Sequence, residues 1–70
     1  MSMENYQAIC NALCSTLRLT RQFDDIVSLE HRQEGHERFV VATFDGGHTK
    51  TVRVTMDSGI AMIKDIIRNL

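Results

Sequence analysis

The chain lacks proline and tryptophan, and it lacks an excess of either charge, with eight Lys and Arg against nine Asp and Glu. The missing basic excess argues against a protein that binds nucleic acid mainly through phosphates, and the missing acidic excess argues against a mimic of nucleic acid. The longest apolar runs, 39–42 and 60–63, have four residues, against the roughly 20 that cross a bilayer. What is present is 70 residues that are 43% apolar, which is enough for a single domain and too apolar for a disordered tail.

The cysteine content and the N-terminal segment indicate a cytoplasmic protein. Only two cysteines are present, Cys10 and Cys14, whereas a small secreted domain usually carries four or more. Segment 1–7 is polar and does not resemble a signal peptide. Without a linker, a repeat or a low-complexity segment, we expect residues 1–70 to form a single small α+β domain.

Apolar residues near both ends recur at spacings of three and four, which predicts two amphipathic helices. The first helix starts near Ser2, a suitable N-cap, and its apolar side comprises Met3, Tyr6, Ile9, Cys10, Leu13 and Leu17. The second helix follows Asp57 or Ser58 as its cap, and its apolar side comprises Ile60, Ile63, Ile66, Ile67 and Leu70. Such a stripe is usually core, and the alternative for the second is an anchor for the groove of a partner.

Between the helices the apolar period becomes two, which predicts three strands whose core side comprises Val27, Leu29, Val40, Ala42, Phe44, Val52 and Val54. Turns are expected at 34–36 and 45–47. A two-residue turn at Glu34 and Gly35 would pair Leu29 with Val40. A three-residue loop at 45–47 would pair Val40 with Val52 and keep the apolar faces together.

The resulting order predicts a two-layer α-β-β-β-α fold, with both helices on one face of a three-stranded antiparallel meander. The other face of the sheet stays open, with Phe39 and Val41 at its centre. Arginine and threonine side chains would cover these two residues, or the face is a contact patch for a protein partner or a second copy. We expect the contact patch, and with it a homodimer, at Phe39, Val41, Arg32, Arg53, Thr43 and Thr51.

Other candidate sites have less specific patterns. Cys10 and Cys14 lie on one side of a helix, where they would pack in the core, form a redox pair, or join two of His31, His36 and His48 around zinc. Cys14, His31 and Asp24 would be the members of a nucleophilic set, but their spacing does not favour it. A chain of 70 residues also leaves little room for a buried pocket. We therefore expect no enzyme activity, no cofactor, no metal and no membrane contact.

The element order, the length, and the turn from Glu34-Gly35-His36 to Phe39 resemble the double-stranded-RNA-binding domain over nearly the whole chain. The resemblance implies the same topology and contacts to duplex RNA through the first helix, the first turn and a lysine-rich start of the last helix. Segment 56–63 contains no lysine, so the implied affinity is weak. The residues that would carry this alternative are His36, Arg38, Lys50 and Arg53.

Taken together, these patterns favour a non-enzymatic protein-interaction module over a nucleic-acid binder. One role that fits such a module is that of an accessory protein of a phage or mobile element.

Overall fold

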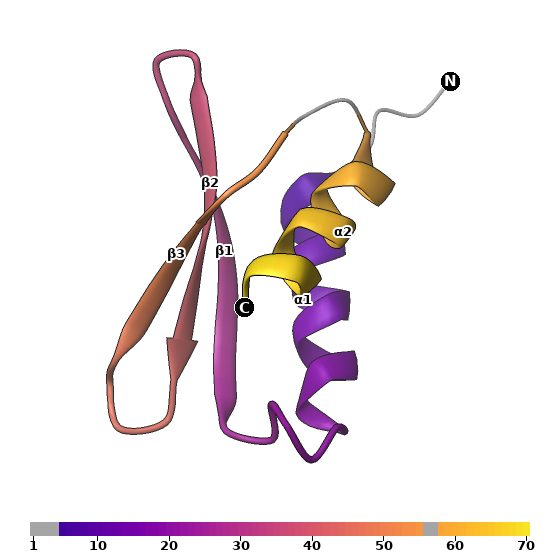
Figure 1. Cartoon of the computed structure of the whole chain (residues 1–70), viewed down its shortest axis with the longest axis vertical. Coiled ribbons are helices and arrows are strands. Elements are labelled where there is room, and N and C mark those ends of the chain that lie inside the picture. Colours follow the sequence, from indigo (N-terminus) through magenta and orange to yellow (C-terminus); the bar gives the residue numbers. More distant parts are fainter. Residues whose placement is uncertain (1–4, 56–57) are drawn as a thin grey trace.

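Two helices and three strands follow one another in the predicted order in this computed structural model, which describes residues 5–55 and 58–70. The elements are α1 (Tyr6–Arg18), β1 (Ile26–Glu34), β2 (Glu37–Phe44), β3 (Thr49–Arg53) and α2 (Gly59–Asn69). The strands form one antiparallel sheet in the order β1-β2-β3. Both helices lie on the same side of the sheet (Figure 1), so the predicted two-layer α+β fold is confirmed.

Both helices begin at a polar residue that caps them. The Asn5 side chain accepts a hydrogen bond from the backbone N–H of Ala8 at 3.0 Å, and the Ser58 hydroxyl accepts one from Ala61 at 3.1 Å. These oxygens satisfy N–H groups that have no partner inside the helix. Ser58 was one of the two caps predicted for the second helix, and Asp57, the other, lies outside the described residues. The prediction that the first helix starts near Ser2 was wrong, because Asn5 is extended and caps a helix that begins at Tyr6.

The first hairpin turns one residue later than predicted. Glu34 pairs with Glu37, so Gly35 and His36 form the turn, and Leu29 lies opposite Ala42, not Val40. Gly35 has a φ of +60°, which suits the first central position of a tight hairpin turn and which glycine adopts without strain. The predicted pairing was therefore wrong by two residues. A shift of two keeps every side chain on its own face, so the faces stay as predicted.

The second hairpin has the predicted register. Val40 lies opposite Val52, and the backbone N–H of Phe44 donates to the carbonyl of His48 at 2.9 Å. The three residues between them are Asp45, Gly46 and Gly47, and both glycines have a positive φ. The glycine pair allows the backbone conformation that a loop of odd length requires here.

A β-bulge at the start of β1 changes which residue enters the core. The register shifts between Ile26 and Ser28, which leaves Val27 as the extra residue. Ile26 is 1% exposed and Val27 is 50% exposed. The prediction that Val27 packs in the core was wrong, because Ile26 occupies that place.

The core lies between the sheet and the two helices, and it contains Cys10, Cys14, Leu17, Ile26, Leu29, Val40, Ala42, Val52, Val54, Met62 and Ile66. In α2 the buried side is only partly the predicted one: Ile66 is in the core as predicted, Met62 was not predicted there, and Ile60 and Ile67 were predicted there but are exposed. Met62 and Ile66 are fully buried, whereas Ile60 is 62% exposed and Ile67 is 54% exposed. Apolar residues cover more than one side of this helix, so their spacing alone did not identify the side that packs. Among the described residues, no helix combines the length and apolar character needed to cross a membrane.

Candidate interaction face of the sheet

The side of the sheet away from the helices, called the open face below, is built from three cross-strand rows. Alternation along the strands and the two registers place these rows on it: Ser28–Thr43–Thr49, Glu30–Val41–Thr51 and Arg32–Phe39–Arg53. All six residues predicted for the contact patch belong to these rows. The sequence prediction therefore brought together residues that are neighbours in the structure, although they come from three strands.

Phe39 lies at the centre of the most charged row, directly between two arginines. Arg32 Nε lies 3.2 Å from Glu30 Oε1, and the Arg53 guanidinium forms an ion pair with Glu37. More than half of each of these four charged side chains is exposed, so the pairs add little to stability. Both arginines are direct cross-strand neighbours of Phe39, whose ring is half-buried.

Val27 extends the apolar part of the molecular surface at the start of β1. The bulge leaves its side chain half exposed beside Ser28, while Phe39 and Val41 are half-buried in the middle strand. Sequence reasoning missed Val27, because strict alternation places it in the core. No residue type in segment 26–28 marks the bulge, so no local signal was available to find it.

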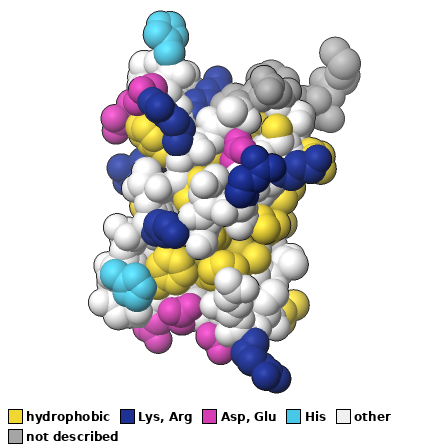
Figure 2. Space-filling model, viewed as in Figure 1, with side chains coloured by type: hydrophobic (Ala, Val, Ile, Leu, Met, Phe, Trp, Pro, Cys, Tyr) yellow, Lys and Arg dark blue, Asp and Glu magenta, His cyan; other side chains and the backbone are white. Residues whose placement is uncertain are grey.

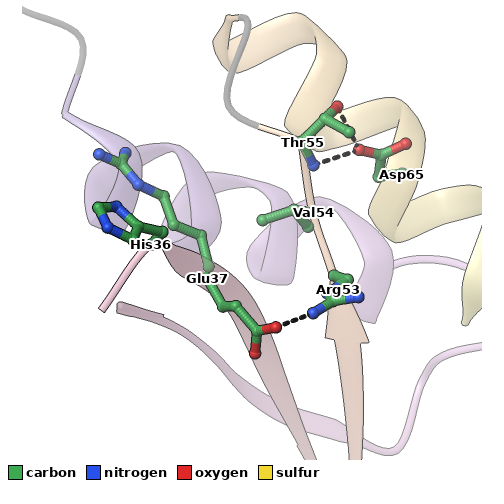
Figure 3. A pocket seen from close by; sticks show the side chains of 7 residues that line it. His36, Glu37, Arg53, Val54, Thr55 and Asp65 are labelled. Atoms are coloured by element: carbon green, nitrogen blue, oxygen red, sulfur yellow. Dashed lines mark hydrogen bonds and ion pairs between the residues drawn. The ribbon is translucent and has the colours of Figure 1, made fainter. Parts of the chain in front are cut away.

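A shallow pocket of about 320 Å³ lies where β2 begins and β3 ends (Figure 3), lined by His36, Glu37, Arg38, Arg53, Val54, Thr55 and Asp65. It brings together three of the four residues of the nucleic-acid alternative: His36, Arg38 and Arg53. The fourth, Lys50, lies elsewhere, and its Nζ donates to the Leu70 carbonyl at 3.2 Å.

The carboxylates in this pocket already have partners. Glu37 is paired with Arg53, and Asp65 Oδ2 accepts from the backbone N–H and the hydroxyl of Thr55, both at 2.8 Å. The two hydrogen bonds from Thr55 lower the pKa of Asp65, so it stays charged. The pocket is therefore of mixed charge, and charges of both signs also alternate over the face that Figure 2 shows. Neither feature is typical of a phosphate-binding surface.

His31 lies on the helix side of β1, where its ring centre is 5.5 Å from that of Tyr6. Its Nε2 is buried and has no hydrogen-bond partner among the described residues. Burial lowers the pKa of His31, and the nearby positive charge of Arg38 lowers it further. Asp24 precedes β1, and His31 stands five residues beyond Ile26, about 16 Å along the strand, so β1 separates these two members of the nucleophilic set.

The two cysteines lie in the core, as their packing alternative predicted. Cys10 is fully buried, and burial, followed by the neighbouring Cys14, raises the pKa of its thiol to about 11. A thiol with so high a pKa is almost entirely protonated at neutral pH, and the thiolate is the reactive form. Within 5–55 and 58–70 there is no group of three or more His, Cys, Asp or Glu side chains that could hold a metal ion.

The chain matches no protein-family model, no curated protein and no solved structure. The likeness to the double-stranded-RNA-binding domain is therefore one of element order and of the first turn.

Proposed function

We propose that this chain is a non-enzymatic, cytoplasmic protein-interaction module that contacts a protein partner or a second copy of itself through the open face, and that it forms a homodimer. The observation that carries the proposal is the row Arg32–Phe39–Arg53. Aromatic residues and arginine are enriched where proteins bind one another, and a central aromatic ring with a polar rim is the usual anatomy of such a contact.

The two ion pairs support the proposal because they place charges of both signs around Phe39. Glu30 and Glu37 pair with Arg32 and Arg53, which lie on either side of Phe39. The partner that fits has a small apolar side chain to contact Phe39 and polar groups of both signs around it.

The test compares proteins captured from a cell lysate by the wild-type chain, by Phe39→Ser and by a control, Ile67→Ser. The control also replaces an exposed apolar residue, but on α2. We expect the wild type and Ile67→Ser to capture a partner that Phe39→Ser does not capture. Binding measurements with the purified partner should give the same result. Equal binding by both variants, each with the wild-type circular dichroism spectrum, would contradict the role of the open face.

A weak nucleic-acid binder is the second candidate, supported by the convergence of His36, Arg38 and Arg53 on one pocket. This function predicts an affinity for duplex RNA that falls steeply as the salt concentration rises from about 50 to about 200 mM, because binding to phosphates releases counterions. Titration of a labelled RNA duplex tests it. Replacement of Arg38 by Gln should abolish the binding if the pocket is responsible.

A further inference from the structure

The two edges of the sheet differ in what covers them, and the edge of β1 is covered by α1. The Gln7 amide donates from Nε2 to the Leu29 carbonyl at 3.0 Å and accepts at Oε1 from the His31 backbone N–H at 2.8 Å. Arg18 donates to the carbonyls of Ile26 and Val27 at 3.1 and 2.8 Å. Because these outward groups are already bonded, another strand cannot add to β1 along this stretch.

The edge of β3 has no such cover. Backbone bonds from Phe44 to His48 and from Val54 to Arg38 show that the even-numbered residues of β3 pair with β2. The N–H and C=O groups of Thr49, Thr51 and Arg53 therefore point away from the sheet. These residues are exposed, and in the part of the chain that the structure describes no group bonds to their outward backbone atoms.

We propose that the chain dimerises through this edge, with β3 antiparallel to β3 of a second copy around a two-fold axis at Thr51. The inference rests on the homodimer of the proposed function and assigns it to a surface other than the open face. Thr51 would pair with the second copy's Thr51, and Thr49 with the second copy's Arg53. Each of these pairs exchanges two backbone hydrogen bonds.

The side chains of β3 select this register. If the register between the two β3 strands shifts so that Thr49 pairs with the second copy's Thr51, Lys50 lies opposite the second copy's Lys50. Like charges directly opposite each other destabilise a sheet. If the register shifts the other way, Thr51 pairs with the second copy's Arg53 and Thr49 with its Thr55. The last pair needs the Thr55 N–H, which already donates to Asp65 at 2.8 Å. In the register centred on Thr51, Lys50 faces Val52, and the paired threonines are a favourable cross-strand pair. This self-complementarity favours a second copy over an unrelated strand.

Dimerisation at this edge pairs Thr51 and Arg53 with the second copy and leaves Phe39 and Val41, in the middle strand of the open face, uncovered. A two-fold axis perpendicular to the sheet keeps the open faces of both copies on the same side. The result is a continuous sheet with strand order β1-β2-β3-β3-β2-β1 and two Phe39 contact sites. A partner with two matching surfaces would bind such a dimer more tightly than the monomer, because the second contact forms within the complex.

The experiment is light scattering over a range of protein concentrations on the wild type, Thr51→Pro and Thr51→Val. Proline removes the outward N–H of Thr51 without removing a hydrogen bond inside the sheet, and proline is tolerated on edge strands. Valine keeps the N–H. We expect the wild type and Thr51→Val to rise from 8.0 kDa to twice that mass, and Thr51→Pro to stay monomeric with the wild-type circular dichroism spectrum. A wild type that stays monomeric at high micromolar concentration would overturn the inference.

Phe39→Ser separates this inference from the proposed function. It should still dimerise. If it is monomeric while Thr51→Pro dimerises, the dimer uses the open face, so the edge is excluded and the proposed function stands.

Amide hydrogen exchange of the wild type keeps the test valid even if the proline variant fails to fold. The amides of Thr49, Thr51 and Arg53 should exchange more slowly as the dimer forms, whereas that of Gln33, on the outer side of β1, should not change. Unchanged exchange at Thr51 while the mass doubles would refute the edge contact.

Discussion

Gln7 binds His31 across the boundary between α1 and β1, with Gln7 Oε1 2.8 Å from the His31 backbone nitrogen. The other end of the same amide donates to the Leu29 carbonyl. One side chain thereby satisfies two backbone groups that an additional strand would otherwise satisfy. The contact holds α1 along β1 and closes that edge of the sheet.

Replacement of Gln7 by Ala should therefore lower the free energy of unfolding by about 1–3 kcal/mol, because a partly buried N–H and C=O lose their partner. Urea unfolding followed by circular dichroism measures the loss. Asn11→Ala is the matched control: it removes the other hydrogen bond of the Gln7 amide, at 2.8 Å on the exposed surface of α1, and should cost no more than about 0.5 kcal/mol. Equal losses in the two variants would show that the edge contact contributes nothing.

The hairpins show how far sequence reasoning reaches. At 45–47 the glycine pair and the need to keep Phe44 in line with the core left one acceptable register, and that register was correct. At 34–36 two different two-residue turns keep the same faces. The choice between them depends on which position Gly35 takes in the turn, and alternation carries no information on that.

The same limit applies to α2 and to the sheet edges. Apolar residues surround enough of α2 that the sheet, not the periodicity, selects Met62 over Ile60 and Ile67. The open face followed from alternation, which is a local property. The difference between the two edges depends on Gln7 and Arg18 reaching β1 from a distant part of the sequence, and no local pattern predicts such contacts.

The state of His31 should make the stability of the domain depend on pH. Burial and Arg38 hold the pKa of His31 below the value of about 6.5 that it has in the unfolded chain. Below about pH 6.5 the unfolded state therefore binds more protons at His31 than the folded state does, so the free energy of unfolding falls as the pH falls through the folded-state pKa. Above about pH 6.5 His31 is neutral in both states and its contribution to stability is complete.

Urea unfolding between pH 5 and pH 7.5 measures this dependence. His31→Phe retains a ring against Tyr6 and removes the titrating group, so the dependence should become smaller. His36→Asn changes an exposed histidine in the turn and should leave it unaltered. If His31→Phe keeps the full dependence, His31 is not its source.

The thiol of Cys10 should react only when the protein unfolds. In the wild type its pKa is about 11, and burial, the larger cause of that shift, remains when Cys14 is replaced, so almost no accessible thiolate is expected at neutral pH. In a Cys14→Ala variant, labelling with an aromatic disulfide reagent should be slow in buffer and should accelerate through the urea transition. Rapid labelling of the folded variant would show that the Cys10 thiol is accessible and would contradict its packing in the core.

Truncation of two apolar residues in α2 tests which side of this helix packs against the sheet. Met62→Ala should cost about 2–5 kcal/mol, because Met62 is fully buried between the helices and the sheet and its removal leaves a cavity. Ile67→Ala should stay within about 0.5 kcal/mol, since Ile67 is largely exposed. Both variants introduce alanine into the same helix, so helix propensity favours both and the difference reports burial. The opposite order of stability would mean that Ile67 packs in the core together with Ile66, as the predicted stripe of Ile60, Ile63, Ile66, Ile67 and Leu70 requires.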